Sequence, residues 1–416
     1  MDLVETGPAV KVRVEVPRDC LFGPDNLPYG VFAPGGAPFR AGVRIGDHVL
    51  DLAAVLDDEV FGRPDLNAFL AQGPRRWRQV RDRVRELVDG EIAASALFPA
   101  AEVRMALPVR IGDYVDFYAS IDHAMNLGRL LRPDTEPLLP NWRHLPVGYH
   151  GRAGTVVVSG TEIVRPCGQQ RGDTGAPVLG PSQQLDIEAE LGFVIGVGSD
   201  RPMAVDEFAD HVFGVALVND WSARDLQAWE YRPLGPFLSK SFATSMAPWI
   251  TPLDALSSAR IPLGPQTPEP LPYLRGHQDW GLDIELCVRW NGEEVSRPSY
   301  SRMYWSPAQM LAHLTVNGAG TRPGDLYASG TVSGPAKNQC GSFIELSWGG
   351  WEPVHVAGAE RRFLLDGDEV TITATAPGPV GTRLGLGEVA GRVLPARVEG
   401  ASLPTASDAC ADRSET

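Results

Sequence analysis

Residues 185–197 read LDIEAELGFVIGV, and this run predicts a long β-strand near the middle of the chain. Successive side chains of a strand point to opposite faces, so Asp186, Glu188 and Glu190 would share one face. Three neighbouring carboxylates repel one another unless a positive charge holds them together. The pattern leaves two alternatives: an exposed acidic face on an edge strand, or a site for a hard divalent cation, which prefers oxygen ligands.

Strand patterns also dominate the sequence around this run. Residues 154–159 are rich in β-branched side chains, and residues 282–290 place apolar side chains at alternate positions. Asn291-Gly292 follows directly and predicts a hairpin turn. Short helices are expected over about residues 205–212, 223–230 and 307–315, the last beginning with a serine cap and a proline. We therefore expect residues 109–400 to form a large, mainly β domain with little helix.

The first part of the chain, residues 1–108, is predicted to be a small β domain of its own, because 416 residues exceed one ordinary hydrophobic core. Its strand-like runs are separated by proline and glycine and cover residues 10–16, 29–32, 39–45 and 48–52. The arginine-rich residues 75–85 carry Trp77 and Val84 at helical spacing, which predicts an amphipathic helix with a solvated face. Residues 401–416 are small and polar, so we expect a disordered tail.

The composition is that of a soluble globular protein, with 43% hydrophobic and 21% charged residues. A net charge of -15 argues against nucleic-acid binding. The five cysteines are scattered without the paired spacing of a zinc site or a disulfide framework, so a reducing, cytoplasmic setting is expected. No signal segment and no apolar run near the ~20 residues of a membrane span is present, so no membrane partner is expected.

A second acidic site is predicted where the apolar run FGVALVND ends at Asp220. We expect Ser222 to cap the following helix, with Asp225 completing a capping box. Arg224 and Gln227 are three residues apart and would lie on one face of that helix. A guanidinium and an amide beside a carboxylate would frame an anionic oxygen, and a structural salt bridge of Arg224 is the alternative.

Residues 113–152 combine many polar side chains with proline and glycine, which prevent one regular element. Aromatic and apolar residues between them would bury and carry polar neighbours into the protein. Ordered polar loops of this kind commonly carry chemistry. His123 lies in this segment, seven residues after Asp116. A lone histidine is more often structural than catalytic, so the residue type alone leaves both roles open.

Taken together, these segments resemble the fumarylacetoacetase family. The resemblance extends over residues 26–396 and is carried, in family order, by DYVDFY, HAMNLG, LLPNWRHLPVGYHGRAGTVVVSG, LDIEAELGFVIG, VNDWSARDLQAWEYRPLGPFLSKSF, RPGDLYASGTVSGP, IELSW and FLLDGDEV. It implies a mainly β (α+β) fold, with a small SH3-like N-terminal β domain joined to a large C-terminal β-sandwich roll. It also implies a homodimer.

By position, the resemblance implies a site for Ca²⁺ or Mg²⁺. The implied ligands are Asp116, Glu188, Glu190 and Asp220, with a further magnesium position near Asp220, Lys240 and Thr244. Asp186 is not implied as a ligand, although its place in the strand pattern equals that of the two glutamates.

The resemblance also implies a catalytic pair, His123 with Glu345, and we expect Glu345 in the apolar strand SFIELSW. The implied oxyanion-stabilising group is Arg224, Gln227 and Lys240. The implied substrate contacts are Tyr118, Arg132, Tyr149, Gln227, Tyr231 and Thr331. Leu131 departs from the phenylalanine expected there, which affects the shape of the pocket beside Arg132.

The implied reaction is metal-dependent hydrolysis of a carbon-carbon bond in a 1,3-diketone. It converts 4-fumarylacetoacetate and water to fumarate and acetoacetate, the last step of tyrosine and phenylalanine breakdown. The expected partner is a small diketo acid. Two alternatives stay open: another enzyme of the superfamily, such as an acylpyruvate hydrolase, decarboxylase or hydratase, and a cation-stabilised binding protein without turnover.

Overall fold

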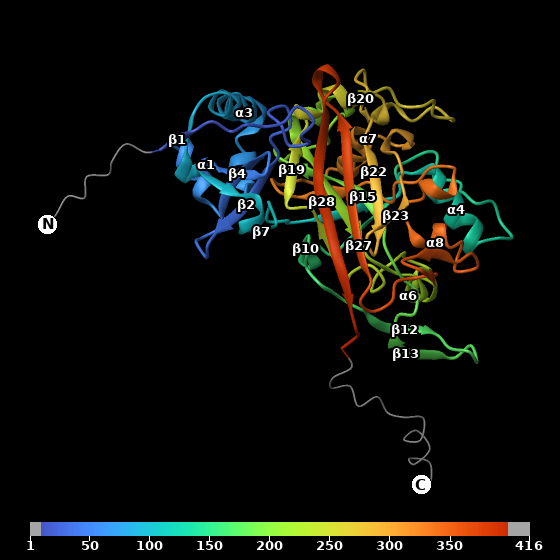
Figure 1. Cartoon of the computed structure of the whole chain (residues 1–416). Coiled ribbons are helices and arrows are strands. Elements are labelled where there is room, and N and C mark those ends of the chain that lie inside the picture. The colour runs from blue at the N-terminus through green and yellow to red at the C-terminus, as the bar shows by residue number, and fades with distance from the viewer. Residues whose placement is uncertain (1–9, 398–416) are drawn as a thin grey trace, which may run out of the picture.

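All residues of strand β16, Val212–Asp220, are buried, and the neighbours with which it pairs, β15 (Ala189–Ile195) and β19 (Trp249–Pro252), lie near the middle of the molecule in Figure 1. The structure is a computed structural model that describes residues 10–397. The apolar run of β16 has no polar face, as expected for a strand that is covered on both sides. It pairs antiparallel with both neighbours.

These strands belong to a thirteen-stranded sheet with the main path β6-β4-β3-β2-β19-β16-β15-β24-β8-β9, to which β7, β10 and β18 are added at the sides. The further strands of this sheet are β2 Tyr29–Pro34, β3 Arg40–Ile45, β4 His48–Asp51, β6 Leu97–Pro99, β7 Val103–Ala106, β8 Tyr114–Phe117, β9 Gly148–His150, β10 Val156–Val158, β18 Thr244–Met246 and β24 Leu326–Ala328. Because β2 pairs with β19, the N-terminal strands continue directly into the sheet of the larger region.

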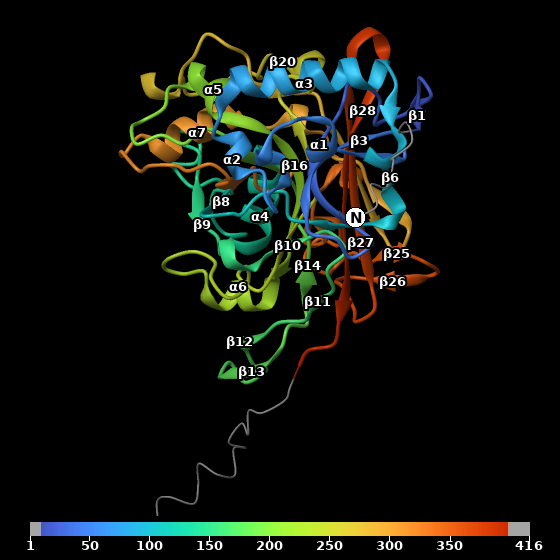
Figure 2. The same cartoon turned by 90° about the vertical axis from the view of Figure 1, so that its left-hand side faces the viewer.

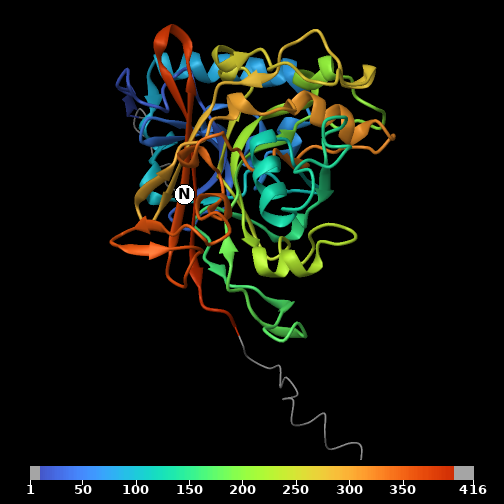
Figure 3. The same ribbon diagram turned by 90° about the vertical axis from the view of Figure 1, so that its right-hand side faces the viewer.

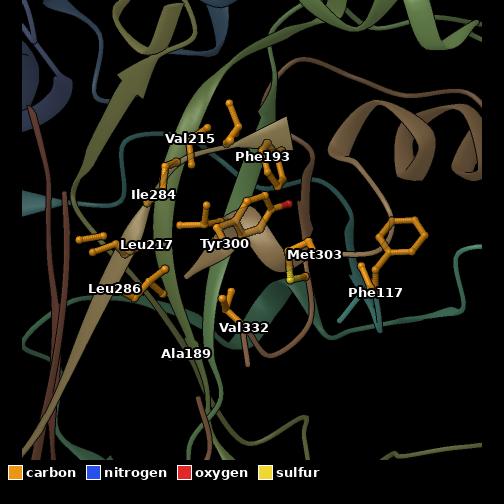
Figure 4. Packing of buried hydrophobic residues seen from close by; sticks show 14 of the residues in the cluster. Phe117, Ala189, Phe193, Val215, Leu217, Ile284, Leu286, Tyr300, Met303 and Val332 are labelled. Atoms are coloured by element: carbon orange, nitrogen blue, oxygen red, sulfur yellow. The ribbon is translucent and has the colours of Figure 1, made fainter. Parts of the chain in front are cut away.

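A second sheet covers one face of the first. Its order is β11-β28-β27-β22-β23. The bounds are β11 Ile163–Val164, β22 Glu285–Trp290, β23 Glu293–Ser296, β27 Glu369–Pro377 and β28 Arg383–Leu394. Figure 4 shows Phe193, Val215 and Leu217 of the large sheet packed with Ile284 and Leu286 at the second sheet. Alternate residues of β16 therefore fill the core between the two sheets.

The N-terminal region covers the other face of β16. Its long helix α3, Gly73–Asp89, lies across the top of this region in Figure 2. The ring of Phe213, in β16, lies 5.3 Å from the rings of both Tyr29 and Trp77. Trp77 belongs to the buried stripe of α3, which confirms the predicted amphipathic helix. Arg81 is an exception to its solvated arginine face, because it is buried and donates to the carbonyl of Asn26 (2.7 Å).

The remaining elements are short. The helices are α1 Leu52–Val55, α2 Asn67–Leu70, α4 Ile121–Leu131, α5 Phe208–His211, α6 Arg224–Glu230, α7 Pro307–Thr315 and α8 Phe343–Leu346. Two-stranded ladders join β1 Lys11–Val12 with β5 Ile92–Ala93, β12 Cys167–Arg171 with β13 Pro177–Pro181, β14 Leu185–Asp186 with β17 Ser222–Ala223, β20 Arg260–Ile261 with β21 Gly281–Leu282, and β25 Val354–Val356 with β26 Ala359–Arg361. Figure 3 shows α4 (teal) above α6 (yellow-green), on the side of the molecule away from the N-terminal region. The protein is mainly β with minor helix, as predicted.

Predictions that rest on local signals are confirmed for α7 and for the hairpin turn. α7 begins at Pro307, after Ser306, whose hydroxyl accepts the N–H of Gln309 (3.1 Å). Asn291 and Gly292 have φ angles of 50° and 83°, the left-handed values of a tight hairpin turn, and they connect β22 with β23.

Two local predictions are wrong. Residues 185–197 do not form one strand, because β14 pairs with β17 and the chain is irregular before β15 begins. Ser222 does not cap α6, because β17 holds it in an extended backbone and its hydroxyl donates to the carbonyl of Asp220 (3.1 Å). Asp225 accepts instead from the hydroxyl of Ser182 (2.6 Å).

Within residues 10–397, no helix combines the length and the apolar character that crossing a membrane requires. Four of the cysteines lie in the same range and are free thiols: Cys20, Cys167, Cys287 and Cys340. The predicted tail, residues 401–416, lies outside the described residues.

Leu217→Ala should lower the free energy of unfolding by about 2–5 kcal/mol, because it leaves a cavity between two packed sheets. Leu217 is 0% exposed in the core cluster. Chemical denaturation would measure the loss. Leu271→Ala is the matched control, since Leu271 is 61% exposed and should lose almost nothing. Equal stability of the two variants would contradict this account of the core.

Candidate metal and catalytic centre

Four buried carboxylates meet at one end of the large sheet. Asp116 comes from β8, Glu190 from β15 and Asp220 from the end of β16, while Glu188 directly precedes β15. One oxygen atom from each of the four lies within 4.8 Å of the others. The register explains the cluster: Ala189 pairs with Asn219, so Glu188 lies opposite Asp220, and β24 connects β15 to β8.

The electrostatics of this cluster fit a hard cation. Asp116 Oδ1 and Glu190 Oε1 are buried and have no hydrogen-bond partner among the described residues. Burial raises the pKa of both carboxyl groups well above the ordinary value, and the neighbouring carboxylates raise it further. Oxygen donors without hydrogen-bond partners are the ligands that Ca²⁺ and Mg²⁺ prefer. The predicted metal residues therefore form a donor set that could hold such an ion.

A basic side chain and two hydroxyl groups surround Asp220. Lys240 Nζ lies 2.8 Å from Asp220 Oδ2 and 2.7 Å from Glu188 Oε2. Thr244 donates to Asp220 Oδ1 (2.8 Å), and Tyr149 donates to Oδ2 (3.1 Å). Burial opposes the charge of Lys240, but Asp220 and Glu188 outweigh it and hold its pKa above the ordinary value. The ammonium group is therefore charged and offers hydrogens to any bound oxygen.

Arg224 connects the cluster with Asp186. Its Nη1 lies 2.8 Å from Glu188 Oε1 and donates to Gln227 Oε1 (3.0 Å), and its Nε donates to Asp186 Oδ2 (2.7 Å). Burial opposes the charge of Arg224, but Asp186 and Glu188 outweigh it and hold its pKa above the ordinary value. Its Nη2 is buried without a hydrogen-bond partner among the described residues. The guanidinium of Arg224 and the amide of Gln227 thus lie together as predicted, and Arg224 Nη2 stays available as a hydrogen-bond donor.

A histidine–glutamate pair lies beside the carboxylates. His123 Nδ1 lies 2.7 Å from Glu345 Oε2, and its Nε2 lies 3.8 Å from Glu188 Oε1. Glu345 also accepts from Asn126 (2.9 Å), Ser333 (2.9 Å) and Ser342 (2.7 Å). Burial opposes the charge of Glu345, but His123 and these hydrogen bonds outweigh it and lower its pKa. The carboxylate is therefore held ionised against one nitrogen of the imidazole.

The prediction that Glu345 lies in a strand is wrong, because residues 343–346 form the short helix α8. The apolar run around Glu345 resembled a buried strand, but Ser342 and Glu345 also have the S-x-x-E spacing of a helix start. Sequence reasoning also missed the donors to Glu345. Asn126 follows His123 by three residues, so the two lie on one face of α4, a signal that the sequence contained. No comparable signal pointed to Ser333.

The predicted substrate contacts are only partly gathered at this centre. Thr331 Oγ1 lies 3.2 Å from His123 Nε2, and the ring of Tyr118 meets the imidazole edge to face at 5.4 Å. Arg132 ends α4 and donates to a backbone carbonyl, while its buried Nε has no partner among the described residues. Tyr231 follows α6 and stacks against the guanidinium of Arg232. No hydrogen bond within residues 10–397 connects the Tyr231 hydroxyl to the four carboxylates.

A cavity of about 250 Å³ reaches this centre from one side. The buried Asp220 and Lys240 line it together with Tyr149 and the exposed Arg152 and Phe237. The cavity therefore gives a small anionic molecule access to the charged groups.

A divalent cation should raise the unfolding temperature more at about pH 8 than at about pH 5. Asp116 and Glu190 have a raised pKa in the folded, metal-free protein, whereas in the unfolded chain it is near the ordinary value of about 4. The stability that their protonated forms contribute is complete below that value and is lost as the pH rises. A cation replaces these protons, so it restores more stability at the higher pH.

Thermal unfolding with Ca²⁺ and with chelator, at both pH values, would measure this difference. The Glu190→Gln variant is the control, because it removes one of the titrating groups and should reduce the gain at the higher pH. An equal gain at both pH values in the wild-type protein would contradict the prediction.

Comparison with known proteins gives the context of this centre. Residues 25–108 match the family profile described as fumarylacetoacetase N-terminal, and residues 114–394 match that of fumarylacetoacetate (FAA) hydrolase C-terminal. The fumarylacetoacetase of Homo sapiens is 45% identical over 413 residues, which cover 92% of this chain and 98% of the human protein. That of Caenorhabditis elegans is 42% identical and covers 94% of this chain and 100% of its own length.

Solved structures with the same fold are more distant in sequence. The fumarylacetoacetate hydrolase of Exiguobacterium antarcticum has a TM-score of 0.55 and 20% identity, covering 89% of this chain and 100% of its own. A maleylpyruvate hydrolase from Sphingobium sp. SYK-6, with the same coverage, has a TM-score of 0.53 and 18% identity. These structures support the fold alone. The two family profiles together span nearly all the described residues, and the matched relatives are aligned over almost their whole length, so the chain belongs to the fumarylacetoacetase family.

Proposed function

We propose that this protein hydrolyses 4-fumarylacetoacetate to fumarate and acetoacetate. The observation that carries the proposal is the buried His123–Glu345 pair at 2.7 Å, in which His123 Nε2 lies 3.2 Å from the Thr331 hydroxyl and 3.8 Å from Glu188 of the carboxylate cluster. A base next to a cation site is what water-driven cleavage of a diketone requires. Curated relatives named fumarylacetoacetase, at 40–46% identity over more than nine tenths of the chain, support the same substrate.

The cation site is proposed at Asp116, Glu188, Glu190 and Asp220, with Ca²⁺ or Mg²⁺ as the resident ion. When bound, the ion supplies Lewis-acid polarisation of the two diketone oxygens. A further magnesium position would use Asp220 and the Thr244 hydroxyl. Lys240 does not fit a ligand of that ion, because a charged ammonium group has hydrogens and no lone pair. We therefore assign Lys240 to the substrate oxygens.

His123 is the proposed general base. Glu345 accepts the Nδ1 hydrogen, so Nε2 keeps the lone pair that takes a proton from water. The resulting hydroxide adds to the carbonyl carbon of the fumaroyl group, which becomes the new carboxylate carbon of fumarate. The carbon-carbon bond then breaks, and its electron pair leaves with the acetoacetate carbon as an enolate. The proton held by His123 passes to that carbon, so the residue returns to its starting state.

Arg224, Gln227 and Lys240 are proposed to hold the oxyanion formed by this addition. The buried Nη2 of Arg224 has no partner among residues 10–397, which leaves it free for that oxygen. A donor in such a position contributes about 3 kcal/mol to transition-state stabilisation.

The substrate carboxylates are assigned to a second group of residues. The proposed contacts are Tyr118, Arg132, Tyr149, Tyr231 and Thr331, together with Gln227. A guanidinium can bind a carboxylate through two parallel hydrogen bonds, so Arg132 is the strongest of these contacts. A homodimer and a cytoplasmic location remain predictions from the sequence.

Purified protein should consume fumarylacetoacetate, seen as a loss of diketone ultraviolet absorbance. Chelator should abolish the reaction, and Ca²⁺ or Mg²⁺ should restore it, because the carboxylate cluster alone cannot polarise the diketone. An acylpyruvate serves as the comparison substrate. Consumption of the acylpyruvate alone would assign the protein to another activity of the superfamily, and consumption of neither would leave a cation-binding protein without turnover.

His123→Ala should lower kcat by about 10²- to 10⁴-fold, because the proton acceptor is removed. Metal content, measured by mass spectrometry, should stay at the wild-type level, since His123 is not one of the proposed ligands. His211→Ala is the matched control: His211 is also buried, but its Nδ1 contacts the carbonyl of Val197 (2.8 Å). Turnover of His123→Ala near that of the control would remove His123 from the mechanism.

A further inference from the structure

Asp186 takes no part in the proposed reaction, yet its carboxylate is completely buried and accepts four hydrogen bonds. Oδ1 accepts the backbone N–H groups of Ile187 (2.7 Å) and Phe343 (2.7 Å). Oδ2 accepts Arg224 Nε (2.7 Å) and the backbone N–H of Ile344 (3.0 Å). Every partner is a donor, so the contact set suits an ionised carboxylate and no other side chain of this size.

The four donors come from both parts of the proposed centre. Phe343 and Ile344 are the first two residues of α8, and Glu345 is the next. The first N–H groups of a helix lack partners within the helix, and no residue adjacent to α8 caps it with a side chain. Asp186 supplies that cap from a position 157 residues earlier in the chain. Arg224, the other partner, is the first residue of α6.

These contacts form a closed ring. Asp186 binds Arg224, and Arg224 Nη1 lies 2.8 Å from Glu188. Glu188 lies 3.8 Å from His123 Nε2, and His123 Nδ1 lies 2.7 Å from Glu345. Glu345 follows Phe343 and Ile344 in α8, and the N–H groups of these two residues bind Asp186, which closes the ring. Two buried carboxylates therefore connect the base with the oxyanion-binding guanidinium, and Asp186 is the one that accepts hydrogen bonds from both Arg224 and α8, the helix of Glu345.

We propose that Asp186 is a positioning residue, which holds His123–Glu345 and Arg224 in the relative placement that diketone cleavage needs. This inference rests on the proposed function. Asp186 is not one of the four carboxylates of the cluster, so its loss should leave the cation site intact. An asparagine of the same size would direct an amide NH₂ group toward donors, leaving at least one of them buried without a partner.

The chain contains a matched control. Asp51 is also buried and accepts the N–H groups of Ala53 (3.0 Å) and Ala54 (3.2 Å) at the start of α1. Its other oxygen accepts Arg40 Nε at 2.6 Å. Asp51→Asn therefore disrupts the same kinds of contact as Asp186→Asn, a helix cap and an arginine pair, but in the N-terminal region.

The test compares kcat, KM, metal content and unfolding temperature of the wild-type holoenzyme, Asp186→Asn and Asp51→Asn. Both variants should unfold at a lower temperature than the wild-type protein. At a temperature where all three are folded, Asp186→Asn should lose about 10- to 100-fold in kcat with wild-type metal content, as expected for a residue behind the reacting groups. Asp51→Asn should keep the wild-type kcat. Wild-type kcat in Asp186→Asn, or loss of its metal, would overturn the inference.

Double variants show through which groups Asp186 acts. Asp186→Asn should cost little further activity in an Arg224→Gln or a Glu345→Gln background, because residues that act as a unit are not additive. Full additivity in both backgrounds would overturn the inference.

If Asp186→Asn does not fold, hydrogen exchange of the wild-type holoenzyme decides. Fast exchange at the Phe343 and Ile344 amides overturns the proposed cap, and slow exchange supports it. An active wild type with an active Asp186→Asn rejects this inference alone, whereas an inactive wild type rejects the proposed function as well.

Discussion

Mutual repulsion among buried carboxylates governs how the charged groups at the centre of this protein are arranged. Six acidic side chains are buried around the end of β16, namely Asp116, Asp186, Glu188, Glu190, Asp220 and Glu345. Ionised groups removed from water must be paired or neutralised. Arg224 and Lys240 neutralise part of this charge, and hydrogen bonds hold Glu345 and Asp186. Within residues 10–397, Asp116 and Glu190 keep oxygens without partners, which suits the cation proposed above.

The fold separates two tasks within this small volume. Neighbouring strands of the large sheet fix the carboxylates, because strand register determines which side chains lie opposite one another. The short helices α4, α6 and α8 bring the histidine, the guanidinium and the second glutamate from distant parts of the chain. A rigid sheet gives a cation site little freedom to move. The chemistry of the centre therefore depends on the side chains that the sheet and the helices bring together, and not on the fold alone.

An aspartate that caps a short helix and also binds an arginine occurs twice in this structure, with different consequences. Asp51 and Asp186 each cap a four-residue helix and bind an arginine Nε. At Asp51 the capping hydrogen bonds join β4 to α1 and span two or three residues, so they stabilise a local connection. At Asp186 the arginine pair and the cap join segments 38 and 157 residues apart, and both carry groups of the proposed centre. The kinds of contact are the same, a helix cap and an arginine pair, and their place in the fold relates only those of Asp186 to the proposed reaction.

Features that depend on near neighbours or on family motifs could be predicted from the amino-acid sequence. The cap of α7, the Asn291-Gly292 turn and the amphipathic α3 follow from signals within a few residues, and the family motifs indicated which residues to examine at the centre. The strand pattern did not separate Asp186 from Glu188; the family resemblance excluded Asp186 as a ligand, and the three-dimensional structure gives the physical reason. β14 leaves the sheet to pair with β17, so Asp186 turns to Arg224 and α8 while Glu188 stays with the cluster. The local S-x-x-E spacing is compatible with the helix that contains Glu345, but the first N–H groups of that helix bind Asp186, a carboxylate distant in sequence, and no local pattern encodes that contact.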